Sequence, residues 1–479
     1  MYLKKMTHPA RSPESFERMA LLRPASQRVN QDTRRRLFWP GFMPLVAGAI
    51  LGCSSTLADE AVTGLTIIHA GTVLAVPGQA PLRNQSIYLR DGRIVELRAG
   101  FGEESGAKII DLREAFVLPG LIDLHVHLTT TSEPGGELDD VTRNSADLAL
   151  LAAVNAERTL SAGFTTVLDV GTGMRVHEEA VFALRDAVAS GLMPGPRILA
   201  TGSPLSIPGQ SRTARFNVEV EAVTGPDNVC SGADDCRRVV RAQVKRGADV
   251  ISFYNTGSLL SNPSPAMTFT EDELLAIIST AHALGRKAIA DGGNTRGDAS
   301  GINAALRAGA DSIDTVTYPD EETWRLLKAG KAWFVPHLYA VQAAVGDTPA
   351  TLQEGTMGWL PVPVLEFLYQ LKNETPSAVQ AHKAGVHFAF GSDPGVFPHG
   401  DNAREFAELV GIGLTQQEAI ATATISAAEM LGLSSEVGTI EPGKSADIIA
   451  TSGNPLEDIR QLEKVNFVMK QGMVYNGRP

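Results

Sequence analysis

The chain has 479 residues, of which 43% are hydrophobic and 20% are charged, an ordinary globular composition. This length exceeds one small domain and accommodates a barrel with a smaller second domain. The formal net charge is -12, and the first 53 residues hold nine basic and three acidic residues, so the remainder carries -18. Such an acidic body is not expected to bind nucleic acid or an anionic membrane.

Residues 1–58 are predicted to be a disordered N-terminus and an export signal rather than part of the fold. Arg34 and Arg35 precede an apolar segment, Leu37–Leu51. That segment is too short to span a bilayer comfortably and fits the hydrophobic core of a signal peptide. The twin arginines resemble a Tat export signal, so we expect a periplasmic protein.

The chain has three cysteines, and their positions also fit an exported protein. Residues 50–53 resemble a lipobox, in which Cys53 would become the lipidated first residue of a membrane-anchored lipoprotein. The alternative is cleavage near Ala58, which would release a soluble product.

Cys230 and Cys236 lie six residues apart in a turn-rich segment. In an oxidising periplasm they can close a small disulfide loop, and two free thiols are the alternative.

Short strands are predicted between residues 62 and 118, with a hairpin turn at Asp91-Gly92. Residues 435–479 show the same pattern of short predicted strands. We therefore expect residues 62–118 and 435–479 to form one small β-sandwich, although two separate β appendages also fit the pattern.

Between these ends, strands alternate with helical stretches such as Glu271–Leu284, for which Thr268 and Thr270 are candidate caps. Eight strands are predicted in chain order: 121–128, Phe164–Gly171, Pro196–Gly202, Ala248–Tyr254, Lys287–Gly293, Asp311–Tyr318, Ala332–Ala340 and His387–Pro394. This alternation predicts an α/β fold, a TIM-type (β/α)8 barrel over residues 119–434. A late helix, Thr415–Leu433, would close it, and the chemistry is expected at the carboxyl ends of the strands.

The first barrel strand contains two histidines after Pro119-Gly120. Because strand side chains alternate between faces, His125 and His127 point the same way. Paired imidazoles at a strand end are natural metal ligands. Two unrelated histidines at a sheet edge are the alternative.

In its Pro-Gly-Leu-Ile-Asp context, this stretch resembles the first barrel strand of the amidohydrolase superfamily. Residues 162–169, 391–405 and 441–447 match the same superfamily. The resemblance covers about residues 62–479 and is strongest to the branch of imidazolonepropionase-like enzymes and Xaa-Pro or Xaa-Arg dipeptidases. It implies metal-dependent hydrolysis, with Asp393 as a metal ligand and as the base.

Four positions depart from the pattern of the two-metal members. Ser252 stands where those members carry a bridging carboxylated lysine, and Asp291 and Thr315 stand where they carry ligand histidines. Gln210 lies in the region of a further histidine. Ser and Thr are poor ligands for divalent ions, and two cations without a bridging group would repel each other. The two-metal arrangement is therefore predicted to be lost.

The residues that remain predict one divalent ion, with zinc favoured and iron as the alternative. His125, His127 and Asp393 would hold it, with Asp291 as a fourth ligand or a close neighbour.

Three further residues are candidates for contact with a small-molecule substrate. Tyr254 lies just past the fourth strand, and His337 lies near the end of the seventh. His399 belongs to the eighth loop, which it can instead simply shape. For the other two, a place on the rim or in a solvent-facing loop is the alternative.

These observations support two hypotheses. In the first, the protein hydrolyses a carbon–nitrogen bond in an amide, a cyclic amide or a dipeptide-like substrate by metal-activated water, with Asp393 as base. In the second, it is a non-catalytic binding protein that kept the fold and lost its ligands. The pattern specifies neither the substrate nor the oligomeric state.

Overall fold

The structure is a computed structural model. It describes residues 64–477 apart from 133–138, 173–174, 211–218, 220–226, 258–266, 293–297, 331 and 375. The chain divides into a unit of residues 1–57 and a unit of residues 58–479, and all described residues belong to the second. Arg34, Arg35 and Cys53 of the predicted export signal lie outside the described residues. Within the described ranges, no helix combines the length and apolar character needed to cross a membrane.

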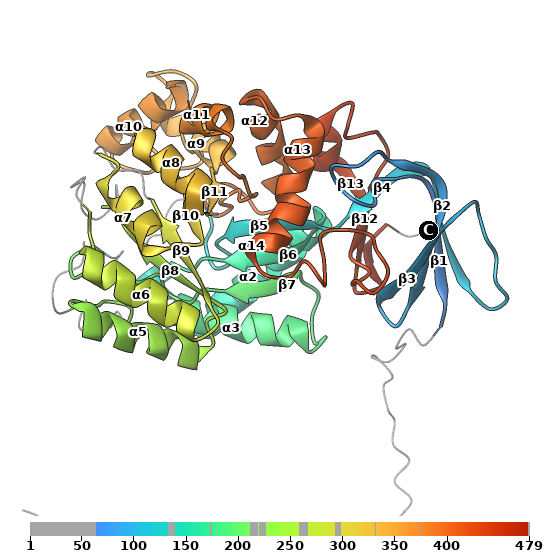
Figure 1. Ribbon diagram of the computed structural model, residues 1–479, viewed down its shortest axis with the longest axis horizontal. Helices are drawn as coiled ribbons and strands as arrows, with labels where there is room; N and C mark the ends of the chain where they lie inside the picture. The colour runs from blue at the N-terminus through green and yellow to red at the C-terminus, as the bar shows by residue number, and fades with distance from the viewer. Residues whose placement is uncertain are drawn as a thin grey trace, which may run out of the picture. The chain divides into compact units, whose positions relative to one another are not determined.

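Strands from both ends of the second unit form one seven-stranded sheet, in the order β14-β13-β12-β4-β1-β2-β3 (Figure 1). Their bounds are β1 Thr66–Val73, β2 Leu82–Arg90, β3 Arg93–Ala99, β4 Lys108–Pro119, β12 Ile448–Thr451, β13 Val465–Lys470 and β14 Met473–Asn476. β2 and β3 form the antiparallel hairpin predicted at Asp91-Gly92. β4 pairs with β12, so the two ends build one β unit, as predicted.

The sheet curls back on itself. The sign of this is a bridge between Arg93 at the start of β3 and Ser445 just before β12. Its inner face packs on itself around buried residues that include Ile68, Ile87 and Phe467. This self-packed sheet is the predicted sandwich. Burial of these alternating apolar side chains is what stabilises it.

The remaining strands form two parallel sheets, β5-β6-β7 and β8-β9-β10-β11. Their bounds are β5 Leu121–Val126, β6 Phe164–Asp169, β7 Arg197–Ala200, β8 Val250–Tyr254, β9 Lys287–Asp291, β10 Ser312–Asp314 and β11 Trp333–Val335. The two sheets meet where Leu205, which follows β7, forms a parallel bridge with Phe253 of β8. Asp249 N also donates to Ala200 O at 2.8 Å.

Residues 387–394 supply the eighth strand. Phe388 forms a parallel bridge with Phe334 of β11. On the other side, Leu124 N donates to Phe390 O and Asp393 N donates to His125 O, both at 2.9 Å. Backbone hydrogen bonds therefore run around all eight strands, and the predicted barrel is confirmed.

Helices lie outside these strands (Figure 1). Their bounds are α1 Asp139–Thr142, α2 Ser145–Ser161, α3 Arg175–Ala189, α5 Ala233–Arg246, α6 Glu271–Ala283, α7 Ser300–Ala308, α8 Glu321–Gly330, α9 Leu338–Ala344, α10 Val362–Asn373, α11 Ser377–Ala384, α12 Glu405–Gly411, α13 Gln416–Ala421 and α14 Ala427–Met430. Thr270 caps α6 in a capping box with Glu273, as expected from the sequence. The predicted late helix is α13 and α14, joined by a π-helical turn at Thr422–Ser426.

Two predicted strands were too long. Asp311–Tyr318 was predicted where β10 ends at Asp314, and the seventh strand shows the larger error. The pattern indicated a strand over Ala332–Ala340, but β11 ends at Val335 and α9 begins at Leu338. His337 between them has a φ of 50°, in the left-handed region that a strand does not contain. Apolar residues on a buried helix face resemble a strand over so short a run, which explains the error.

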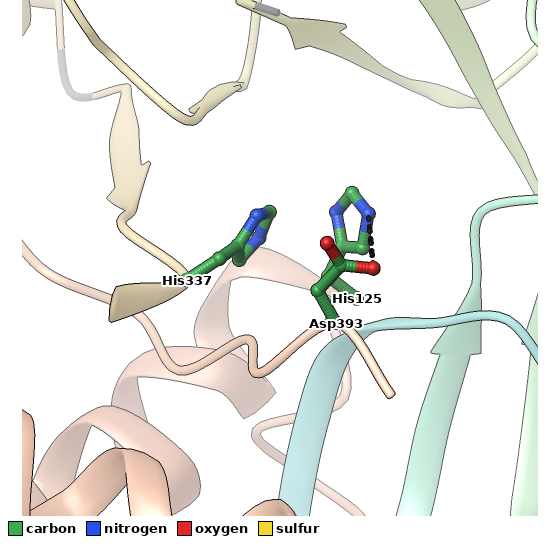
Figure 2. A group of neighbouring side chains, drawn as sticks. All are labelled: His125, His337 and Asp393. Carbon is green, nitrogen blue, oxygen red and sulfur yellow. Dashed lines mark ion pairs between the residues drawn. The ribbon is translucent and has the colours of Figure 1, made fainter. Parts of the chain in front are cut away.

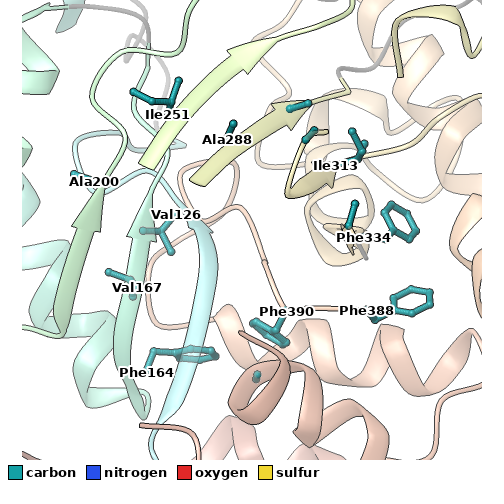
Figure 3. Packing of buried hydrophobic residues seen from close by; sticks show 14 of the residues in the cluster. Val126, Phe164, Val167, Ala200, Ile251, Ala288, Ile313, Phe334, Phe388 and Phe390 are labelled. Atoms are coloured by element: carbon teal, nitrogen blue, oxygen red, sulfur yellow. The ribbon is translucent and has the colours of Figure 1, made fainter. Parts of the chain in front are cut away.

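The largest core lies between the barrel strands and the helices around them (Figure 3). Phe164 of β6, Phe390 of the eighth strand and Phe406 of α12 are fully buried there and stack, with ring centroids 4.5–5.5 Å apart. The predicted disulfide is present, joining Cys230 to Cys236 with their Cα atoms 5.0 Å apart. It ties the chain before α5 to the first turn of that helix.

Candidate metal centre

A cavity of about 270 Å³ opens at the carboxyl ends of the barrel strands. Its polar lining residues are His125, His127, Tyr254, Thr256, Asp291, Thr315, His337 and Asp393. Polar groups from six strands meet there because parallel strands all end on one face of the barrel.

Both histidines of the first strand are held through Nδ1. His125 Nδ1 lies 2.8 Å from Asp314 Oδ2, and His127 Nδ1 lies 2.7 Å from the carbonyl oxygen of Gly171. A carboxylate or carbonyl at Nδ1 favours the proton on that nitrogen and leaves Nε2 free to act as a ligand. Both Nε2 atoms are directed towards Asp393, at 3.9 and 3.3 Å from its Oδ1.

His337 also has a side-chain partner at Nδ1. Its Nδ1 lies 3.0 Å from Thr315 Oγ1. The buried Glu405 carboxylate accepts hydrogen bonds from the backbone N–H groups of Leu338 and Tyr339, at 3.0 and 2.6 Å. This fixes the start of α9 directly after His337. Burial raises the pKa of Glu405 well above its usual value, although these N–H groups oppose the shift.

His125, His337 and Asp393 each offer a ligand atom, and these atoms lie within 4.8 Å of one another (Figure 2). His337 Nε2 and Asp393 Oδ1 are buried and have no hydrogen-bond partner. A buried polar atom without a partner is costly, and a cation between these atoms would satisfy both. Nitrogen and carboxylate donors suit Zn²⁺ or Fe²⁺, so the residues present fit a divalent metal ion.

The eighth strand approaches closely because Gly391 has no side chain. A Cβ atom there would lie 2.4 Å from Val335 Cγ1, 3.0 Å from His125 Cβ and 3.1 Å from His337 Nε2. Next to it, Ser392 donates to the buried Asp123 carboxylate through its backbone N–H at 3.1 Å and through its hydroxyl.

The same Asp123 carboxylate accepts from His125 N at 3.1 Å and from Asn402 Nδ2 at 2.8 Å. Asp123 is fully buried, and burial raises its pKa to about 6, although these donors oppose the shift. It therefore cross-links the first strand to the eighth and fixes His125 relative to Asp393.

Three residues at the ends of consecutive strands have a positive φ. The values are 55° for Thr315, 50° for His337 and 66° for Asp393. This conformation is rare for residues other than glycine, most of all for β-branched threonine. Such backbone strain clusters at active sites, where the surrounding structure enforces it.

Charges in the cavity shift the pKa values of its residues. Burial lowers the pKa of His125, but the hydrogen bond to Asp314 and the charges of Asp393, Asp314 and Asp291 raise it overall to about 9. Burial and the neighbouring His125 hold the pKa of His337 well below its usual value. Burial raises the pKa of Asp393, but the surrounding histidines lower it overall. An ionised Asp393 and a neutral His337 are the forms that a metal ion needs, whereas His125 would have to lose its second proton to bind one.

The structure brings together His125, His127 and Asp393, as the sequence indicated. Asp291 and Tyr254 also line the cavity. The closest group of donors among the described residues is His125, His337 and Asp393, so Asp291 and His127 lie outside it. His337, which was predicted to contact substrate, lines the cavity and also belongs to that group. The sequence signal for this role was its place at the end of the seventh strand, one strand along from the missing histidine at Thr315.

His399 is not among the described residues that line the cavity. Its Nδ1 lies 3.0 Å from Thr159 Oγ1, and its Nε2 lies 3.1 Å from the carbonyl oxygen of His127. Burial lowers its pKa to about 4, so it is neutral. His399 therefore positions the backbone of His127 from behind. Ser252 is buried and is also absent from the described lining.

Comparisons with known proteins agree with this geometry. The model of the amidohydrolase family matches residues 116–476. The ochratoxinase of Aspergillus niger is 31% identical over 462 residues, which cover 88% of each chain. An imidazolonepropionase of Acidiphilium cryptum is 26% identical over 80% of this chain and 90% of its own. The crystal structure of a Xaa-Pro dipeptidase with methionine bound in its active site matches with a TM-score of 0.75 and 32% identity, covering 86% of this chain and all of that one.

The chain therefore belongs to the amidohydrolase family. The resemblance found in the sequence is confirmed, and so is the classification of this protein as a hydrolase of carbon–nitrogen bonds. Its departures from the two-metal pattern all lie within the residues that the family model matches.

Proposed function

We propose that this protein hydrolyses an amide bond in a small molecule with the help of one divalent metal ion, zinc being favoured. His125, His127, His337 and Asp393 would hold the ion. The convergence of His337 Nε2 and Asp393 Oδ1, both buried without partners, carries the proposal. A divalent ion supplies Lewis acidity, which lowers the pKa of water and polarises a carbonyl group.

Asp393 is the residue placed to move a proton. Its pKa is lowered by the surrounding histidines, so the carboxylate is ionised at neutral pH and can accept a proton at Oδ1. His127 Nε2 lies 3.3 Å from that oxygen and would face the same ion. Asp291 faces the same cavity from β9 and adds a second negative charge beside His125.

A single ion is proposed because the second set of ligands is incomplete. Ser252 takes the place of the bridging lysine and is absent from the described cavity lining. Thr315 uses its hydroxyl on His337 Nδ1. Of the positions that depart from the family pattern, only Asp291 provides a charged donor in the cavity, and one carboxylate does not hold a second ion.

The substrate class is proposed from the relatives. Their names include an ochratoxinase, an imidazolonepropionase and a Xaa-Pro dipeptidase. We propose a cyclic amide, an open amide or a dipeptide-like bond in a small molecule, acted on outside the cytoplasm.

The test is a hydrolysis assay on a panel of N-acyl amino acids, dipeptides and cyclic amides, with protein stripped of metal and then given Zn²⁺. Activity should return with zinc and be absent in Asp393→Asn and His337→Ala. The matched control is His282→Ala, which removes a half-exposed histidine on α6 that pairs with Asp311 at 2.7 Å, away from the cavity lining. Absence of activity on every substrate with zinc bound would favour the non-catalytic barrel. Activity that does not depend on zinc would contradict the proposed role of the metal ion.

A further inference from the structure

The cavity has two chemically different walls. The polar residues described above come from the barrel strands and the segments that directly follow them. The apolar side chains among the lining residues form the apolar wall, which consists of Ala340, Val341, Ala344, Met357, Leu360, Val364, Leu368 and Val396. They belong to α9, to the segment before α10, to α10 itself and to the loop after the eighth strand.

The apolar wall is a packed surface. Leu360, Leu368 and Ala344 are buried in a separate hydrophobic cluster, against which Met357 and Val364 pack. A wall fixed by its own core presents a defined shape to a ligand and does not collapse into the cavity. It is also continuous with the metal donors, because α9 carries Ala340, Val341 and Ala344 and begins directly after His337.

Charge is distributed unevenly in the cavity. Among its described lining residues there is no Lys or Arg, and the charged groups are the carboxylates and histidines at the strand ends. A substrate group that carries a carboxylate would lose its hydration against the apolar wall without finding a partner there. A hydrocarbon group would gain from leaving water.

We propose that this wall is the subsite for an apolar side group of the substrate, an aliphatic or aromatic hydrocarbon attached next to the scissile amide. The inference rests on the proposed function and narrows it. Substrates are amides with a hydrocarbon group beside the carbonyl, and amides with an acidic group at that position are excluded.

The binding test uses ligands that have no hydrolysable bond. The primary alcohols 1-butanol, 1-hexanol and 1-octanol are titrated into the full-length protein by calorimetry. Each added CH2 group should tighten binding about fourfold until the wall is covered. Binding that does not depend on chain length would overturn the subsite.

Two variants on α10 form a matched pair. Val364 lines the cavity, whereas Val362 is 49% exposed on the same helix. Val364→Lys should weaken binding of 1-octanol at least tenfold, and Val362→Lys should leave it unchanged. If Val364→Lys does not fold, as judged by circular dichroism, Val364→Thr replaces it with an expected several-fold loss. Equal effects at the two positions would contradict the proposal.

Hydrolysis assays distinguish a failure of the subsite from a failure of the proposed function. Hexanamide and adipamate share a six-carbon acyl chain, but adipamate ends in a carboxylate. Hexanamide should be hydrolysed at least tenfold faster, and Val364→Lys should reverse the preference. If alcohols bind with chain-length dependence but no amide is cleaved, the subsite stands and the proposed hydrolysis fails. If amides are cleaved without such preference and alcohols do not bind, the hydrolysis stands and the subsite fails.

Discussion

At the residue scale, the site is defined by what holds each imidazole. His125, His127 and His337 each engage a partner through Nδ1, and those partners lie 189, 44 and 22 residues away in sequence. The His-x-His pair and Asp393 were predictable because strand periodicity and a local motif mark them. Their partners were not, because only the folded barrel brings them together.

His337 and Thr315 provide the first prediction. His337→Ala removes a donor of the proposed metal set, so zinc affinity should fall by more than the roughly 10- to 100-fold that loss of an outer hydrogen-bond partner costs. Thr315→Val removes only the partner of His337 Nδ1, so its loss of zinc affinity should lie within that roughly 10- to 100-fold range. Competition with a coloured chelator measures both affinities. An unchanged affinity in His337→Ala would remove this residue from the set.

At the element scale, the disulfide joins the chain before α5 to the first turn of that helix. Cys230 and Cys236 are six residues apart, and closure of so short a loop stabilises the fold by about 2 kcal/mol in the chain-entropy estimate. The double variant Cys230→Ser/Cys236→Ser should therefore lower the free energy of unfolding by about that amount. Urea denaturation of oxidised and variant protein gives the difference. Equal midpoints would show that the bond contributes nothing.

Lys470 of β13 joins the sheet to the barrel. It is buried, and its Nζ donates to the carbonyl oxygen of Gly195 at 2.6 Å. Burial lowers its pKa from 10.5 to about 8, with the Asp447 charge opposing the shift and the Arg197 charge adding to it. The cost of burying the charge is therefore present below pH 8 and is relieved as pH rises towards 10.5, because the unfolded chain keeps its proton longer.

The free energy of unfolding of the wild type, relative to Lys470→Met, should thus rise between pH 8 and 10.5, by about 3 kcal/mol at most. Comparing the two proteins at each pH cancels the titration of all other groups. A constant or falling difference over that range would contradict a lowered pKa at Lys470.

The bounds of the barrel strands show which features local sequence predicts. Six barrel strands were placed to within a few residues because their apolar runs are bounded by turns, whereas the sixth strand was extended four residues past the end of β10. β11 was overextended, because nothing in residues 336–340 signals the left-handed turn at His337. That turn depends on Glu405, which accepts hydrogen bonds from Leu338 and Tyr339 at the start of α9 and lies 67 and 66 residues further along the chain.

At the scale of the whole molecule, strand and helix alternation was enough to predict a barrel, and matching β texture at the two ends was enough to predict a shared sheet. How the barrel closes was not predictable. It depends on single backbone bonds such as that from Asp393 N to His125 O at 2.9 Å. Those bonds also set the distance between the metal donors, so the detail of the site follows from the closure of the fold.

Export is a proposal about the whole chain. The twin arginines and the apolar segment Leu37–Leu51 motivate it. Replacement of both Arg34 and Arg35 by lysine should leave the precursor in the cytoplasm, as fractionation and immunoblotting would show. Cys53→Ala should separately release the exported protein from the membrane fraction. Normal export of the double variant would remove the Tat assignment, and unchanged partitioning of Cys53→Ala would remove the lipid anchor.

The most direct test of the proposed function is the metal content of the purified protein, prepared without chelators and measured by plasma mass spectrometry. The ligand set of His125, His127, His337 and Asp393 predicts one divalent ion per chain, with zinc favoured, and its loss in His125→Ala. Two ions per chain would show that Asp291 and its neighbours rebuild the second site. None would contradict the account.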